Sequence, residues 1–155
     1  MATLQLLGKT RPGAVLLTFL DTRLVCGFPS PAADYESEQV DLNELMLRHP
    51  DASFLARAKG DSMRGVGIHD GDVLAVDRSM VVQDGDIVVA CVEGDCTVKR
   101  LVRRANSVVL VAESEGFAPI EVTNADDLRI WGVVVAVLNP LVSEGRRGLS
   151  YARPD

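Results

Sequence analysis

The chain has 155 residues, of which 47% are hydrophobic and 25% are charged, a composition typical of one ordinary globular domain. Its formal net charge is −6, so it lacks the excess of lysine and arginine with which proteins bind phosphates, and little direct nucleic-acid binding is expected. The small arginine clusters are interpreted as solvated charge on strand edges or in a tail; they comprise Arg100, Arg103, Arg104, Arg146 and Arg147.

Residues 1–40 are expected to form a flexible, irregular N-terminal arm. The apolar run AVLLTFL (14–20) is too short to span a bilayer, and no small-residue cleavage site follows it, so neither a membrane anchor nor an export signal is predicted. The stretch GFPSPAADYESE (27–38) contains two prolines and a glycine, which disfavour both a helix and a central strand.

One short helix is predicted in DLNELMLRHP (41–50). Asp41, followed three residues later by Glu44, resembles a capping box, in which side chains satisfy the free N–H groups of the first helical turn. Apolar residues then recur at helical spacing and give the helix one apolar face. Pro50 is expected to end the element.

From about residue 51 the sequence changes to short apolar runs rich in β-branched residues. Turn signals built on Asp-Gly or Glu-Gly separate several of these runs, as in chains of β-hairpins. The expected strands cover residues 73–76, 86–92, 96–102, 107–112, 120–122 and 128–138. The pattern predicts an all-β fold with one compact β-rich domain over residues 41–140, and residues 141–155 are expected to form a mobile tail.

The three cysteines, at positions 26, 91 and 96, do not indicate a disulfide framework, although Cys91 and Cys96 can meet across a hairpin. Two cysteines without a neighbouring histidine do not make a zinc site. The repeated Asp-Gly-Asp sequences are interpreted as turns rather than as carboxylate metal ligands. No metal and no cofactor is therefore expected, and the cysteine usage fits a reducing cytoplasm.

The stretch KGDSM (59–63) places a serine in a glycine-containing turn. Ser62 is either a nucleophile or a turn serine that only satisfies backbone groups. A nucleophilic serine needs a base, and neither His49 nor His69 has a partnered aspartate in a pattern that indicates a catalytic triad.

A lysine is the other candidate base, because an amine that burial keeps neutral can accept a proton. Lys99 lies in the middle of the expected strand CTVKRLV (96–102). Two-residue alternation places Lys99 on one face with Thr97 and Leu101. This spacing also suits a lysine that points into water, so both interpretations stay open on the pattern alone.

Three motifs together resemble a known family. KGDSM, the following GIHDGDVLAVD, and TVKRL, whose lysine comes 37 residues after Ser62, are similar to the self-cleaving Ser–Lys peptidase domain of the LexA and UmuD family. The resemblance covers about residues 14–139. It implies that Ser62 is the nucleophile and Lys99 the general base. Backbone N–H groups of Asp61 and Ser62 would stabilise the oxyanion, and Thr97 would orient the amine.

The stretch CGFPSPAADY (26–35) resembles the cleavage region of the UmuD branch, in which a Cys–Gly bond is cut, here Cys26–Gly27. Glycine has no Cβ and lets backbone approach a buried nucleophile closely, and tethering gives the arm a high effective concentration. Cys26 as a nucleophile is disfavoured, because no histidine lies near it in sequence. Only 26 residues precede Gly27, too few for the DNA-binding domain of LexA-type repressors, so the UmuD branch is favoured.

That branch implies a cytoplasmic homodimer that acts in the SOS response to DNA damage. A RecA filament on single-stranded DNA would stimulate self-cleavage, and the trimmed product would serve as the accessory subunit of a UmuC-type, error-prone translesion DNA polymerase. Two alternatives stay open. One is a non-catalytic, β-rich dimeric interaction module that binds a polymerase, and the other is a peptidase that acts on other proteins.

Overall fold

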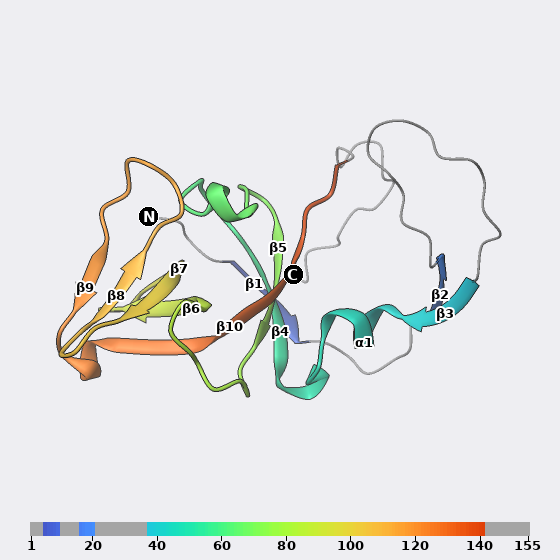
Figure 1. The fold of residues 1–155 in the computed structure, drawn as a ribbon, viewed down its shortest axis with the longest axis horizontal. Coiled ribbons are helices and arrows are strands. Elements are labelled where there is room, and N and C mark those ends of the chain that lie inside the picture. The colour runs from blue at the N-terminus through green and yellow to red at the C-terminus, as the bar shows by residue number, and fades with distance from the viewer. Residues whose placement is uncertain (1–4, 10–15, 21–36, 142–155) are drawn as a thin grey trace.

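The fold is taken from a computed structural model, which describes residues 5–9, 16–20 and 37–141 (Figure 1). It contains one short helix, α1 (Leu42–Met46), and 3₁₀ turns at Pro50–Ala52, Arg64–Val66 and Ala125–Asp127. The strands are β1 (Gln5–Lys9), β2 (Leu16–Leu20), β3 (Ser37–Asp41), β4 (Ser53–Arg57), β5 (Val73–Asp77), β6 (Ile87–Val92), β7 (Asp95–Arg103), β8 (Val108–Val111), β9 (Ile120–Val122) and β10 (Leu128–Leu138). None of the described helices is long and apolar enough to span a bilayer.

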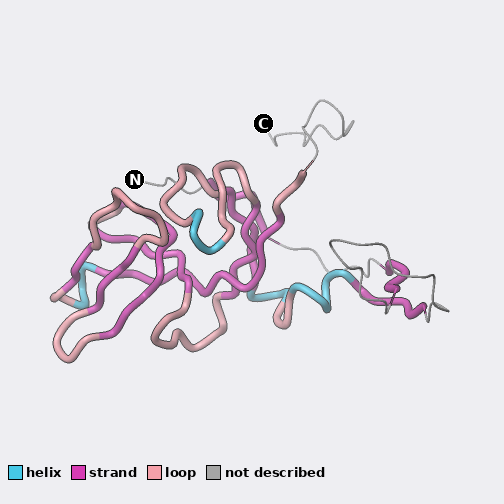
Figure 2. The backbone as a smooth tube through the Cα atoms, turned by 45° about the horizontal axis from the view of Figure 1, so that its top comes forward, coloured by secondary structure: helices cyan, strands magenta, loops and turns pink. Residues whose placement is uncertain are grey.

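Most of the strands form one eight-stranded sheet, in the order β1-β4-β5-β10-β6-β7-β8-β9. Each neighbouring pair in this sheet is antiparallel. Strands β2 and β3 form a separate antiparallel pair. Figure 1 and Figure 2 both show this pair beyond α1, away from the large sheet. The all-β fold predicted from the sequence is confirmed.

The six strands expected from the sequence are present as β5 to β10, because their apolar runs and turn signals are local and strong. The sequence did not predict β4, which has only five residues. Within the segment expected to be irregular, the structure adds β1, β2 and β3. Strand β1 pairs with β4 at the edge of the large sheet, so this part of the arm is ordered by a partner distant in sequence.

The predicted helix is confirmed, with two differences. Asp41 is its N-cap and accepts a hydrogen bond from the backbone N–H of Asn43 at 2.9 Å. The helix ends at Met46 rather than at Pro50, because the following residue is already extended, and Pro50 instead begins a 3₁₀ turn. The expected apolar face does not pack into a core of the described chain, since α1 has no buried residue and Leu45 is 63% exposed.

Both faces of the central strands are buried. Along β6, Val89 belongs to one buried cluster, with Leu74, Val76 and Val98, whereas its neighbour Val88 belongs to a second. A strand that is covered on both sides reads as a continuous apolar run, which explains the sequence IVVACV of β6. Side chains on both faces in the middle of β6 and β7 therefore lie in a low-dielectric environment, as the buried neighbours Val98 and Lys99 show.

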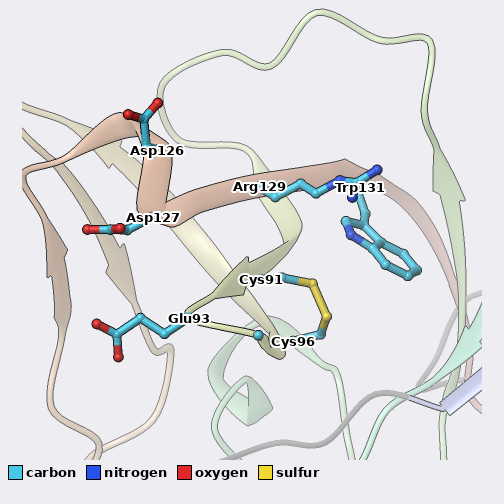
Figure 3. Close-up of a pocket in the computed structure, with 8 residues that line it drawn as sticks. Cys91, Glu93, Cys96, Asp126, Asp127, Arg129 and Trp131 are labelled. Carbon is cyan, nitrogen blue, oxygen red and sulfur yellow. A yellow bond between two sulfur atoms is a disulfide. The ribbon is translucent and has the colours of Figure 1, made fainter.

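The turn between β6 and β7 sets the register of the two strands. Glu93 and Gly94 both have positive φ angles, 51° and 91°, which suit a two-residue hairpin loop. The loop pairs Cys91 with Cys96, and the structure joins these cysteines in a disulfide next to Trp131 of β10 (Figure 3). Their meeting across a hairpin, which the sequence allowed, is thus observed, but the disulfide between them was not predicted from the cysteine count and spacing. The expected tail lies outside the described residues from residue 142 onward.

At Gly132, β10 lies against β5 with no room for a side chain, and replacing this glycine with alanine tests the packing. A Cβ atom there would lie 2.6 Å from the Asp77 carbonyl oxygen and 2.8 Å from Cγ1 of Val76. Backbone cannot move aside cheaply, so we expect Gly132→Ala to lower the free energy of unfolding in urea by about 2 kcal/mol. The control Val135→Ala, on the same strand but 37% exposed, should cost less than about 1 kcal/mol. Equal losses would contradict the close contact.

Candidate active site

Ser62 lies in the turn that follows β4, and it is buried although it is polar. The residue is only 1% exposed. The turn begins at Gly60, whose φ of 89° favours glycine and whose N–H is bound by the carboxylate of Asp70 at 2.7 Å. Met63, directly after the serine, is 2% exposed and packs into the core beside Leu74. The methionine therefore anchors the turn that carries the hydroxyl.

Lys99 meets Ser62 inside the protein. The lysine is 3% exposed, and its Nζ donates to Ser62 Oγ at 2.8 Å. The same Nζ contacts Thr97 Oγ1 at 3.0 Å and the Val98 carbonyl oxygen at 3.0 Å. Thr97, Lys99 and Leu101 are all buried, as expected of one strand face, and the question of which way the lysine points is settled. The structure thus brings together Ser62, Lys99 and Thr97.

Burial lowers the pKa of the Lys99 amine below its ordinary value of 10.5, because desolvation penalises the charged form. A larger share of the amine is consequently neutral at a given pH. When Lys99 is neutral, the 2.8 Å contact can run in the other direction, with the Ser62 hydroxyl donating to the amine. That is the arrangement in which a lysine acts as a general base toward a serine.

Asp61 contributes through its backbone. Its carbonyl oxygen accepts from the Ser114 hydroxyl at 2.7 Å and from the Arg64 N–H at 3.3 Å, while its side chain is 56% exposed. The oxyanion role expected for the N–H groups of Asp61 and Ser62 stays a prediction. The expected cleavage site, Cys26–Gly27, lies outside the described residues, in the connection between β2 and β3.

A cleft of about 430 Å³ opens beside the lysine. Thr97 and Lys99 form one part of its wall, and Phe117, Ala118 and Ile120 form another. Phe117 is 43% exposed, so its ring is available to a bound segment. Sequence reasoning missed this wall, because the residues before β9 carry no motif and reach the lysine only through the fold. The cleft can accept an extended, mainly apolar stretch of chain.

Both histidines have aspartate partners that the sequence pattern did not reveal. His49 Nδ1 lies 2.7 Å from Oδ2 of Asp77, and His69 Nδ1 lies 3.5 Å from Oδ2 of Asp72. Burial by itself would raise the pKa of Asp77, but hydrogen bonds from Ser79 and His49 outweigh it and lower that pKa. The Ser62 hydroxyl is hydrogen-bonded to Lys99 and not to either histidine–aspartate pair.

The interpretation of Arg100 as solvated charge was wrong. Its guanidinium pairs with Glu113 and donates to the Gly85 carbonyl oxygen at 2.6 Å, and its side chain is only 33% exposed.

No group of three or more His, Cys, Asp or Glu side chains is arranged to hold a metal within residues 5–9, 16–20 and 37–141.

Comparison with known proteins places this chain in a family. The model of the Peptidase S24-like family matches residues 18–135. Protein MucA of Salmonella typhimurium is 42% identical over 120 residues, which cover 76% of this chain and 81% of that protein. Protein ImpA of the same organism is 42% identical over 118 residues, covering 76% of this chain and 79% of that protein.

A LexA repressor, from Vibrio vulnificus, is 44% identical over 117 residues, which cover 75% of this chain and 56% of the repressor. The match to the family model and the identity to these relatives extend over most of the chain. The chain belongs to the Peptidase S24-like family. The predicted resemblance to the LexA and UmuD family is confirmed.

The lowered pKa of Lys99 should make the free energy of unfolding depend on pH, and Lys99→Met should remove this dependence. Between the lowered pKa of the folded state and 10.5, the unfolded chain binds a proton that the folded chain has released. The free energy of unfolding should therefore rise with pH across this window and level off above 10.5. Urea titrations between pH 7 and 11 should show this rise in the parent chain and lose it in Lys99→Met. Lys59→Met, at an exposed lysine, should keep the rise; parallel curves for the parent and Lys99→Met would refute buried titration.

Proposed function

We propose that this protein is a self-cleaving serine peptidase in which Ser62 is the nucleophile, Lys99 is the general base, and the Cys26–Gly27 bond is the substrate. The observation that carries the proposal is the 2.8 Å contact between Lys99 Nζ and Ser62 Oγ, made by two side chains that are both almost completely buried. Membership in a peptidase family supports the same reaction class.

In the first half of the reaction, the neutral amine of Lys99 takes the proton of the Ser62 hydroxyl as Oγ attacks the carbonyl carbon of Cys26. The negative charge on the carbonyl oxygen is stabilised by the N–H groups of Asp61 and Ser62. The ammonium then returns its proton to the nitrogen of Gly27 as the peptide bond breaks. An ester between Ser62 and the Cys26 carbonyl remains.

In the second half, water attacks this ester and Lys99 again accepts the proton, which then passes to Ser62 Oγ as the acid is released. Thr97 Oγ1 and the Val98 carbonyl oxygen, each 3.0 Å from Nζ, hold the amine while its charge changes. Both acceptors stabilise the transient ammonium, which would otherwise be an unpaired charge in a buried site. The products are the free arm and a chain that begins at Gly27.

Removal of the arm is proposed to act as a one-way switch. Cleavage would expose surface that the arm covers, and the trimmed homodimer would then bind a UmuC-type translesion DNA polymerase as its accessory subunit in the cytoplasm during the SOS response. The relatives of this chain, which include a LexA repressor and the proteins MucA and ImpA, support a role in the SOS response. The slow step is proposed to be docking of the arm in the cleft beside Lys99.

The alternative is a β-rich dimeric module that binds a polymerase while its Ser–Lys pair is idle. The structure offers one observation against idleness: an amine buried without catalytic use is costly, yet Lys99 is buried with its nitrogen aimed at Ser62. A peptidase that acts on other proteins would use the same dyad, and differs only in the substrate that enters the cleft.

Self-cleavage is tested by intact mass against time at pH 7 and at about pH 10. Because the amine must be neutral, the rate should rise with pH and level off once Lys99 has lost its proton. The product should begin at Gly27. Ser62→Ala and Lys99→Ala should each slow its appearance by more than about a thousandfold.

Two residues outside the site supply matched controls for these variants. Ser107→Ala removes a hydroxyl whose partner is the surface carboxylate of Glu121, and Lys59→Ala removes an exposed amine, so both should cleave at the parent rate. Cleavage of Ser62→Ala at the parent rate would rule out the dyad. Cleavage at a different bond would keep the dyad and reject Cys26–Gly27 as its substrate.

The trigger is tested separately, by adding a RecA filament on single-stranded DNA at neutral pH. A partner that favours the docked arm raises the population of the cleavable state, so the rate should increase by at least about tenfold. At pH 10 the increase should persist, because docking and deprotonation are independent steps. An unchanged rate at both pH values would remove the filament from the proposal and leave the dyad in place.

A further inference from the structure

The turn that carries Ser62 is also held by the residues that follow β8. The backbone N–H of Glu113 donates to the carbonyl oxygen of Ser62 at 2.8 Å. The carbonyl oxygen of Glu113 in turn accepts from the N–H of Gly65, also at 2.8 Å. A single residue from a distant segment thus binds the nucleophile's own peptide unit and the residue three positions further on.

Ser114 adds a second pair of contacts to the same turn. Its hydroxyl donates to the carbonyl oxygen of Asp61 at 2.7 Å and accepts from the N–H of Arg64 at 3.1 Å. The hydroxyl therefore joins the residue before the nucleophile to the residue two positions after it. We refer to Glu113 and Ser114 together as the clamp.

The clamp is tied to the strand that carries the base. Arg100, the residue after Lys99 on β7, forms an ion pair with the side chain of Glu113 and also donates to the Gly85 carbonyl oxygen at 2.6 Å. Alternation along β7 sends Lys99 and Arg100 to opposite faces. Strand β7 consequently supplies Lys99, which contacts the Ser62 hydroxyl, and Arg100, which pairs with the residue that binds the Ser62 backbone.

Position 65 is shaped for this contact. A Cβ atom on Gly65 would lie 2.1 Å from the carbonyl oxygen of Glu113, closer than any real Cβ contact. Glycine therefore permits the turn to approach the clamp closely enough for the 2.8 Å hydrogen bond. The neighbouring Gly67 has open space around the same position, so the close approach is specific to residue 65.

We propose that Glu113 and Ser114, supported by Arg100, are positioning residues that hold Ser62 in line with Lys99 for attack. This inference rests on the proposed function. The clamp touches neither the reacting oxygen nor the amine; it fixes the backbone on both sides of the nucleophile. A nucleophile displaced by a fraction of an ångström loses rate even when its base keeps the same pKa. The clamp therefore sets the maximal rate, and the burial of Lys99 sets the pH at which that rate is reached.

The test uses Ser114→Ala, which removes both hydroxyl contacts and leaves the backbone bonds of Glu113 in place. The rate of self-cleavage is measured from pH 6 to 11 in the full chain. We expect the plateau rate to fall about tenfold while the pH of half-maximal rate stays at the parent value. Ser114→Thr, which keeps a hydroxyl, should restore most of the plateau rate. Ser107→Ala, which loses a surface hydroxyl bond instead, should behave like the parent.

A second variant separates positioning from simple loss of stability. Glu113→Gln keeps the backbone contacts and removes the charge that Arg100 holds, so we expect a smaller fall in plateau rate with the same midpoint pH. Thermal unfolding is measured in parallel for every variant. A fall in plateau rate that tracks the melting temperature across all variants, or a shift in the midpoint pH, would overturn the positioning role. An unchanged plateau in Ser114→Ala would overturn it as well.

A probe that does not depend on the arm distinguishes failure of this inference from failure of the proposed function. An alkyl fluorophosphonate is attacked at phosphorus by Ser62 Oγ, whose proton passes to Lys99 as fluoride leaves. Intact mass reports the phosphonate ester, and peptide mapping places it at Ser62. If the parent chain gives no product at Gly27 but is labelled at Ser62, the proposed self-cleavage fails, and slower labelling of Ser114→Ala still supports the clamp. Equal labelling rates would overturn the clamp. A parent chain that neither gives a product at Gly27 nor is labelled at Ser62 would overturn the clamp together with the proposed function.

Discussion

The site depends on one contact, the hydrogen bond between the amine of Lys99 and the hydroxyl of Ser62, made where water is excluded. A lysine in water is charged and cannot accept a proton, whereas burial lowers its pKa and makes the neutral amine accessible. The cost of burying the amine is limited by its acceptors, Thr97 Oγ1 and the Val98 carbonyl oxygen. Removing the lysine from water is therefore what turns an ordinary turn serine into a candidate nucleophile.

The surrounding strands and turns place Lys99 and Ser62 together in the interior. Strand β7 lies between β6 and β8, so neither of its edges is open, and Lys99 in its middle is only 3% exposed at the wall of the cleft. The two-residue loop at Glu93 and Gly94 sets the register that places the lysine opposite Val88. Met63 packs the nucleophile turn into the core, and the residues after β8 form hydrogen bonds with the backbone of that turn.

Adjacent residues of β7 act on the same serine by different means. Lys99 reaches the Ser62 hydroxyl directly, whereas Arg100 reaches its backbone through Glu113. Such an arrangement links the backbone of the nucleophile to the strand that carries its base. Gly65 completes it, because only a residue without a Cβ allows the turn and the Glu113 carbonyl oxygen to come so close.

The sequence by itself determined the strands from β5 to β10 and the short helix after Asp41, because each rests on local periodicity and local turn or cap signals. The family, and with it the expected pairing of Ser62 with Lys99, came from the resemblance of three motifs. Tertiary structure decided the burial of Lys99, since alternation defines a face without saying what covers it. It also decided the contacts of Glu113 and Ser114 with the serine turn, which join segments about fifty residues apart. Those contacts are backbone hydrogen bonds and a hydroxyl bridge, and they leave no residue pattern in a single sequence.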